Sequence, residues 1–195
     1  MRIMALALVW SAAVLEGRGL GAAAGQEVDV YVHNHVSIGQ PVMYRATVEA
    51  SGIFRGIGVR LEWKTATPPR GPGCRQFVIL TIAESAPRDS NPLALALTEL
   101  HSGAVTVFYD QLRPLLFTWP SLLPTLMAHV LAHEIAHSLQ GLRRHSEAGI
   151  MKPYWTVADY HAMQDGRLAF TPLDATLIRA GIAAGASGCQ VLTAP

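Results

Sequence analysis

The residues with the clearest chemical potential form one short motif, His133-Glu134-Ile135-Ala136-His137. On a helix, two histidines four positions apart project from the same face, one turn apart, so both rings can reach a single metal ion. Glu134 then lies beside the first ring, where it could accept a proton from an attacking water molecule. This H-E-x-x-H pattern is typical of zinc hydrolases.

A zinc hydrolase needs a third protein ligand and keeps the fourth position open for water. Gly141 predicts the end of the helix, because glycine commonly adopts positive φ just after a helix. His145 lies beyond this turn and is our predicted third ligand. Three other side chains remain alternatives for this role: Glu147, Asp159 and His161.

A methionine-containing turn follows, Gly149-Ile150-Met151-Lys152-Pro153. The order of motif, glycine, third histidine and methionine turn resembles the metzincin zinc endopeptidases, and the turn is similar to that of the matrixin branch, where methionine precedes proline by two. The resemblance implies that His133, His137 and His145 bind Zn²⁺, that Glu134 is the general base, and that Met151 forms a hydrophobic floor under the metal. Ordinary core packing of Met151 is the alternative and predicts the same burial.

The spacing departs from the usual metzincin pattern. The glycine and the third histidine usually follow the second histidine by three and six residues, whereas the intervals here are four and eight. The longer pattern, which includes His145-Ser146 and Trp155, also resembles a set of small secreted bacterial proteins of uncharacterised function. The strong part of the resemblance runs from about Met127 to Trp155.

The resemblance implies an α+β fold with a twisted mixed sheet, packed helices, an active-site helix and a small, mostly helical C-terminal subdomain. In that fold, a peptide or protein substrate binds as an added strand along an edge strand that precedes the active-site helix. We predict this edge strand at Gly103–Asp110. Backbone pairing would supply affinity, and side-chain pockets would supply selectivity.

Two further side chains near the motif could contribute to the site. His129 lies one turn before His133, and we predict that it forms part of the cleft wall, with metal binding or transition-state donation as alternatives. Tyr154, near the methionine turn, could also donate a hydrogen bond to a developing oxyanion.

The remaining elements must position these groups. Alternating apolar residues predict a half-buried strand over 28–36, and further strands are predicted over 59–64, 77–83 and 104–109, while 93–100 fits either a strand or a helix. Ser37 and Gln40 resemble a capping box for a first helix that ends near Phe54 and buries Val42, Ala46, Ala50 and Ile53. The β-α-β order predicts parallel pairing of the first two strands.

Three later helix starts are predicted. The active-site helix should begin near Ser121, with Pro124 in its first turn, where the missing N–H does no harm. Thr156 with Asp159 and Thr171 with Asp174 have the spacing of helix caps. The last helix is expected to bury an apolar set consisting of Leu173, Leu177, Ile178 and Ile182.

The N-terminus has the features of a signal peptide over residues 1–24: a basic start, an apolar run and small residues at 22–24. Its removal would leave residues 25–195 as a single metalloprotease-like catalytic domain, secreted or periplasmic, without a stable membrane span. Cys74 and Cys189 could then pair in an oxidising compartment. A cysteine thiolate that blocks the zinc is the alternative.

The composition fits one globular domain of 195 residues, half of them apolar, with a formal charge of +1. Because no basic stripe is present, nucleic acid is not an expected partner. We therefore predict a secreted zinc-dependent endopeptidase that hydrolyses peptide bonds. The alternatives are a non-catalytic zinc-bearing peptide-binding module and a zinc hydrolase of non-peptide amides.

Overall fold

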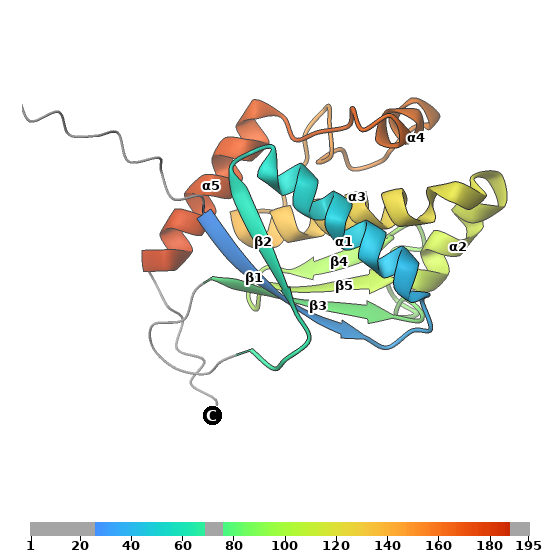
Figure 1. Cartoon of the computed structure of the whole chain (residues 1–195), viewed down its shortest axis with the longest axis horizontal. Coiled ribbons are helices and arrows are strands. Elements are labelled where there is room, and N and C mark those ends of the chain that lie inside the picture. The colour runs from blue at the N-terminus through green and yellow to red at the C-terminus, as the bar shows by residue number, and fades with distance from the viewer. Residues whose placement is uncertain (1–25, 69–75, 188–195) are drawn as a thin grey trace, which may run out of the picture.

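The structure is a computed structural model that describes residues 26–68 and 76–187 (Figure 1). The predicted signal peptide and both cysteines lie outside the described residues. The elements, in chain order, are β1 (Gln26–Asn34), α1 (Gln40–Arg55), β2 (Val59–Lys64), β3 (Phe77–Ala83), β4 (Ala96–Glu99), β5 (Ala104–Phe108), α2 (Tyr109–Thr118), η1 (Pro120–Leu122), α3 (Leu123–Gln140), α4 (Val157–Gln164) and α5 (Pro172–Ser187).

The five strands form one mixed sheet in the order β2-β1-β3-β5-β4. The first four strands in this order are parallel, and β4 runs antiparallel to β5. The predicted parallel pairing of the first two strands is confirmed, with Gln26 opposite Val59 and Tyr31 opposite Lys64. Strands β2 and β3 have the predicted bounds.

The predicted half-burial of β1 is wrong. Asp29 and Tyr31 are buried together with Val28 and Val30. The reason is that side chains of the neighbouring strands β2 and β3 cover them: the Lys64 ammonium lies 3.0 Å from the Asp29 carboxylate, and Tyr31 packs edge-on against Phe77, with ring centroids 5.8 Å apart.

The predicted edge strand at Gly103–Asp110 is also wrong, because β5 pairs with β3 on one side and with β4 on the other. The ambiguous stretch before it supplies the true edge. Strand β4 turns back onto β5 through a tight loop in which Gly103 adopts a φ of 69° and donates its N–H to the Glu99 carbonyl.

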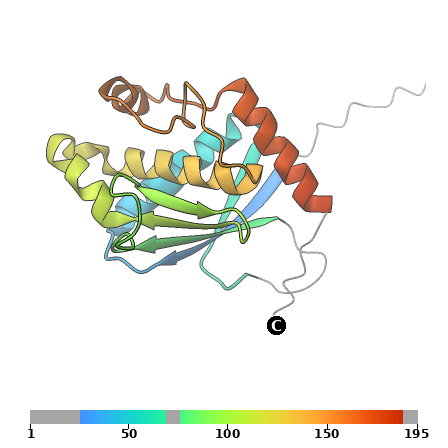
Figure 2. The ribbon, with the colours of Figure 1, turned by 180° about the vertical axis from the view of Figure 1, so that it is seen from behind.

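Helices α1 and α3 lie side by side on one face of the sheet, as both views show (Figures 1 and 2). Helix α1 starts at Gln40 with Gly39 as its N-cap and no side-chain cap, so the predicted Ser37 capping box is wrong. It buries Ala46, Ala50 and Phe54 completely, while Val42 and Ile53 are only partly buried. Helix α2 was not predicted.

Helix α3 is central, and almost every residue from Leu126 to Gln140 is buried. Pro124 lies in its first turn and Gly141, with φ 65°, caps its end, as predicted. Because α3 is packed on nearly all sides, the histidines that it carries are held in fixed positions relative to the rest of the fold.

The part of the chain after α3 contains helices and loops and, within residues 142–187, no strand. Helix α5 packs on the C-terminal end of α3, where a Cβ on Gly181 would come within 1.9 Å of the Leu139 carbonyl oxygen. Ile178 and Ile182 are buried as predicted, but Leu173 is 52% exposed because it lies on the outer side of the first turn, and Leu177 is only partly buried. None of the described helices is long and apolar enough to cross a membrane.

Candidate metal centre

Three histidine rings converge beside helix α3. The Nε2 atoms of His133 and His137 are 3.1 Å apart, and His145 Nε2 lies 3.3 Å from His137 Nε2. Two nitrogens bound to one tetrahedral zinc ion at its usual bond length would be about 3.4 Å apart. The separations therefore match those of ligands that share one ion.

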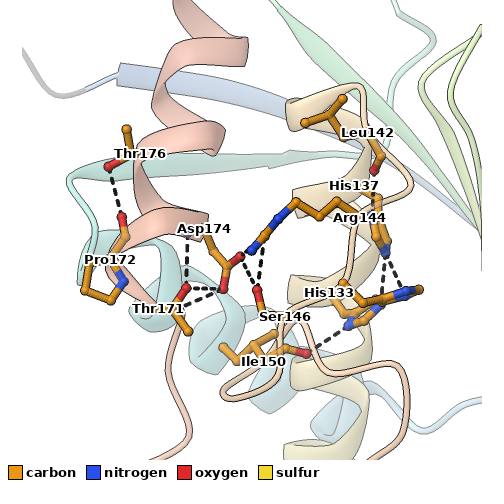
Figure 3. A network of polar contacts seen from close by, with 11 residues as sticks. His133, His137, Leu142, Arg144, Ser146, Ile150, Thr171, Pro172, Asp174 and Thr176 are labelled. Atoms are coloured by element: carbon orange, nitrogen blue, oxygen red, sulfur yellow. Dashed lines mark hydrogen bonds and ion pairs between the residues drawn. The ribbon is translucent and has the colours of Figure 1, made fainter.

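The opposite ring nitrogens hold two of these rings in place (Figure 3). His133 Nδ1 donates to the Ile150 carbonyl, and His137 Nδ1 donates to the Leu142 carbonyl, both at 2.8 Å. Since a carbonyl can only accept, these bonds place the ring proton on Nδ1 and leave the Nε2 lone pairs facing the common centre. Backbone carbonyls commonly orient metal-binding histidines in this way.

The protonation states also suit a metal. Burial lowers the pKa of His133 to about 4, and burial together with the neighbouring His133 lowers the pKa of His137. Both rings are therefore neutral near pH 7, as metal binding requires. Two neutral nitrogens that both direct lone pairs at one point repel each other unless a cation lies between them. The group can hold a metal ion, and three imidazoles suit Zn²⁺.

The alternative third ligands lie elsewhere. Within the described residues, the group of possible ligand atoms comprises His133, His137 and His145. Asp159 instead binds the start of α4 and the ammonium of Lys152. The ring of His161 packs edge-on against Trp119, with centroids 4.9 Å apart.

Glu134 lies next to the histidine group and is only partly exposed. Burial raises the pKa of its carboxyl group, while a hydrogen bond from Thr98 and the nearby histidines act in the opposite direction. The Thr98 hydroxyl is 2.6 Å from Glu134 Oε2 and 3.1 Å from the Glu134 carbonyl oxygen. Thr98 was not predicted, because its place opposite α3 depends on the pairing of β4 with β5.

The methionine turn is attached to the same centre. Gly149 adopts a φ of 75°, and a Cβ at this position would lie 2.4 Å from the Ala169 carbonyl oxygen, which accepts the Ile150 N–H. The Ile150 carbonyl in turn accepts hydrogen bonds from His133 and from Trp155 Nε1. Met151 is fully buried, as both interpretations of this residue predict.

The predicted role of His129 in the cleft wall is wrong. The His129 residue is 1% exposed, and its ring lies between α1 and α3, where Nδ1 donates to the Thr125 carbonyl and is 3.8 Å from the Glu49 carboxylate. The four-residue spacing advances each ring by about 40° around the helix, so the ring of His129 points away from the group formed by His133, His137 and His145. Tyr154, by contrast, is 64% exposed and lines the cleft.

Two adjoining hollows form the cleft. The larger, of about 570 Å³, extends from loop residues 91–95 across α3 to residues 152–155, and the smaller, of about 240 Å³, follows β4 toward Arg143. Both are lined by His133, Glu134 and His145, so these residues lie where the two hollows meet. Strand β4 borders both hollows through Ala96 and its neighbours.

No protein-family model matches the sequence, and no curated protein does. The fold, however, is similar to that of solved structures. A zinc-dependent peptidase from Methanocorpusculum labreanum (strain Z) superposes with a TM-score of 0.51 at 14% identity over 77% of this chain and 99% of that one. Archaemetzincin from Methanopyrus kandleri gives a TM-score of 0.51 at 14% identity over 84% and 99%. The chain therefore has the mixed α+β fold of the metzincin-like zinc peptidases.

Proposed function

We propose that this chain is an exported zinc-dependent endopeptidase in which His133, His137 and His145 bind the metal and Glu134 is the general base. One observation carries the proposal. Three ring nitrogens converge beside a carboxylate at the point where two hollows of one cleft meet. This is the arrangement that metal-assisted hydrolysis requires, with an open side for water and substrate. The similarity of the fold to a zinc-dependent peptidase and to an archaemetzincin supports it.

The chemistry divides between the metal and one carboxylate. When bound, Zn²⁺ lowers the pKa of water to about 7 and polarises the substrate carbonyl. Thr98 holds Glu134 Oε2, which leaves the other carboxylate oxygen to take the proton from the attacking water. Glu134 then passes this proton to the amine that leaves. Because imidazole is an uncharged ligand, the ion would keep its full charge toward the reacting carbonyl.

The substrate would lie along β4. This strand pairs with β5 on one side only, so its other edge offers backbone donors and acceptors to an added strand. It borders both hollows and carries Thr98, which contacts Glu134. A peptide paired with β4 would therefore pass directly over the metal.

The two hollows suggest different side-chain preferences. The larger is lined mainly by apolar groups, including Leu93, Tyr154 and Trp155. Lys152 also lines it, but its ammonium is paired with Asp159. In the smaller hollow, Arg143 makes no hydrogen bond or ion pair with another described residue. We expect a bulky apolar residue on one side of the scissile bond and tolerance of an acidic residue on the other.

Export rests on the N-terminal sequence alone. Residues 1–24 would be removed as a signal peptide, leaving residues 25–195 in the periplasm or outside the cell. N-terminal sequencing of the protein recovered from a secreting host tests this, and a mature protein that begins at Met1 would contradict it.

The activity is tested by incubating the zinc-loaded chain with a mixed peptide library and identifying the cleavage sites by mass spectrometry. We expect internal cleavage that a chelator abolishes and added Zn²⁺ restores. Glu134→Gln should keep its bound zinc and lose about 10²–10⁴-fold in kcat/KM, the usual contribution of a general base. Glu147→Gln is the matched control, because Glu147 is an exposed carboxylate near His145 that lies outside the histidine group.

Full activity of Glu134→Gln would exclude Glu134 as the base. Zinc-dependent peptide binding without any cleavage by the wild-type chain would instead support a non-catalytic binding module.

A further inference from the structure

The three histidines differ in how the protein holds them. His133 and His137 extend from a buried helix, and a backbone carbonyl fixes each ring. His145 extends from an exposed loop, and the polar contact of its ring within the described structure is with His137. A flexible third ligand would cost the site part of its affinity, because the loop would have to be ordered on binding. The loop therefore needs another support.

The residues on both sides of His145 bind one carboxylate oxygen. Arg144 Nη1 lies 2.9 Å from Asp174 Oδ1, and the Ser146 hydroxyl donates to the same oxygen at 2.6 Å (Figure 3). Arg144 also contacts the Ser146 hydroxyl at 3.1 Å. The Ser146 N–H donates to the Met151 carbonyl at 2.7 Å, which joins the loop to the methionine turn. Hydrogen bonds therefore fix both neighbours of His145 in the chain.

The carboxylate is itself held rigidly. Asp174 is fully buried at the start of α5, and its Oδ2 accepts hydrogen bonds from the Thr171 N–H and hydroxyl at 3.2 and 2.6 Å. One oxygen therefore caps the helix and the other holds the loop. Helix α5 is fixed in turn against α3 by the close approach at Gly181. A continuous chain of contacts joins the helix that carries His133 and His137 to the loop that carries His145.

The charge of Asp174 fits this arrangement. Burial alone would raise the pKa of its carboxyl group, but the hydrogen bonds from Ser146, Thr171 and Arg144 outweigh burial and hold the pKa below its usual value. The carboxylate is therefore ionised at neutral pH, and ionised acceptors make the stronger hydrogen bonds.

We propose that Asp174 is a positioning residue of the metal centre: it holds Arg144 and Ser146 so that the intervening His145 meets His133 and His137, and it thereby raises the affinity for Zn²⁺. The inference rests on the metal site of the proposed function but not on peptidase activity. It makes the first turn of α5, far from the motif in sequence, part of the metal-binding apparatus.

The test measures metal binding, with no substrate present. Zinc affinity is obtained by competition with a chromophoric chelator, and coordination is followed in the visible spectrum of the Co²⁺-substituted protein. Asp174→Asn should lower zinc affinity about 10–100-fold, the usual effect of removing a group that orients a ligand. It should also weaken the Co²⁺ bands as His145 leaves the coordination sphere. Circular dichroism must first show that each variant is folded at the temperature used.

Asp159→Asn is the matched control. Asp159 caps α4 in the same way but binds Lys152 rather than residues that flank a histidine of the group. We expect its zinc affinity to stay within about twofold of wild type, since no outer contact of a ligand is lost.

Asp174→Asn could instead keep wild-type zinc affinity and an unchanged Co²⁺ spectrum and show only a lower unfolding temperature. Asp174 would then be only a helix cap, and the inference would be overturned. If Asp174→Asn does not fold, Ser146→Ala decides. It removes one bond between the loop and Asp174 and leaves the cap with Thr171 in place, so a several-fold loss of zinc affinity is expected, and no loss overturns the inference. A wild-type chain that binds zinc but cleaves no peptide would reject the peptidase and leave this inference intact.

Discussion

Two helix starts in the C-terminal part share the pattern Thr-x-x-Asp but have different surroundings. At α4, Asp159 Oδ2 accepts hydrogen bonds from the Thr156 N–H and hydroxyl, both at 2.7 Å, and also binds Lys152. At α5, Asp174 divides its two oxygens between the Thr171 cap and the loop around His145. The Asp159 side chain is 14% exposed, whereas that of Asp174 is 0% exposed.

The comparison separates a local function from a non-local one. Both carboxylates satisfy N–H groups that the first turn of a helix leaves unpaired, which any sequence with this spacing can do. Only the buried carboxylate has a second oxygen directed at a segment 30 positions earlier, through Arg144. The same four-residue pattern therefore caps only the start of a helix at α4, whereas at α5 it also joins two parts of the proposed metal site.

The largest expected difference is in stability. Asp174→Ala should lower the free energy of unfolding by about 3 kcal/mol, because it removes a helix cap and charged hydrogen bonds in a buried place. Asp159→Ala should cost roughly 1 kcal/mol, because water can replace part of what is lost. Urea denaturation of the metal-free proteins measures both, so that metal binding does not contribute. Equal losses of unfolding free energy in the two variants would mean that the burial of Asp174 and its second oxygen add no stability beyond that of a helix cap.

Two glycines allow a similar comparison of turns. Gly149 and Gly166 both adopt positive φ, at 75° and 66°, but a Cβ would clash with Ala169 only at Gly149. Gly166→Ala should cost about 1 kcal/mol for the backbone conformation alone. Gly149→Ala should cost more and should also lower zinc affinity, because the Ile150 carbonyl that orients His133 would move. Similar unfolding midpoints and zinc affinities in the two variants would show that the contact with Ala169 is not needed.

The smallest effect is in the dependence of stability on pH. The pKa values of Asp159 and Asp174 both lie below their usual value: burial acts to raise them, but hydrogen bonds to the ionised forms outweigh it. Each carboxylate therefore adds stability above its unfolded pKa near 3.9, and this contribution is lost as the pH falls through the lower folded pKa. Asp174→Asn and Asp159→Asn should each lose stability less steeply than wild type between about pH 5 and pH 2.

Urea midpoints of the metal-free proteins across this pH range provide the measurement. A variant whose acid profile has the same slope as wild type would show that the carboxylate it lacks is not stabilised in its ionised form.

Much of the fold follows from sequence pattern. Several predictions agree with the structure because each depends on residues close together in the chain: the bounds of β2 and β3, the end of α3 at Gly141 and both C-terminal helix caps. The predictions that failed depend on what lies alongside an element. The burial of both faces of β1 and the inner place of β5 follow from sheet order, which periodicity within one strand does not specify.

The candidate site divides in the same way. The spacing of His133, Glu134 and His137 suffices to bring two imidazoles and a carboxylate together, because an α-helix turns by a constant angle per residue. Thr98 joins Glu134 across 36 positions, and no local pattern could indicate this contact. The edge at β4, the turn of His129 into the core and the support of His145 by Asp174 likewise arise where segments distant in the chain pack together. Such contacts depend on the whole arrangement of sheet and helices. The convergent pair of histidines can therefore be predicted from five adjacent residues, while the surroundings that orient the pair cannot.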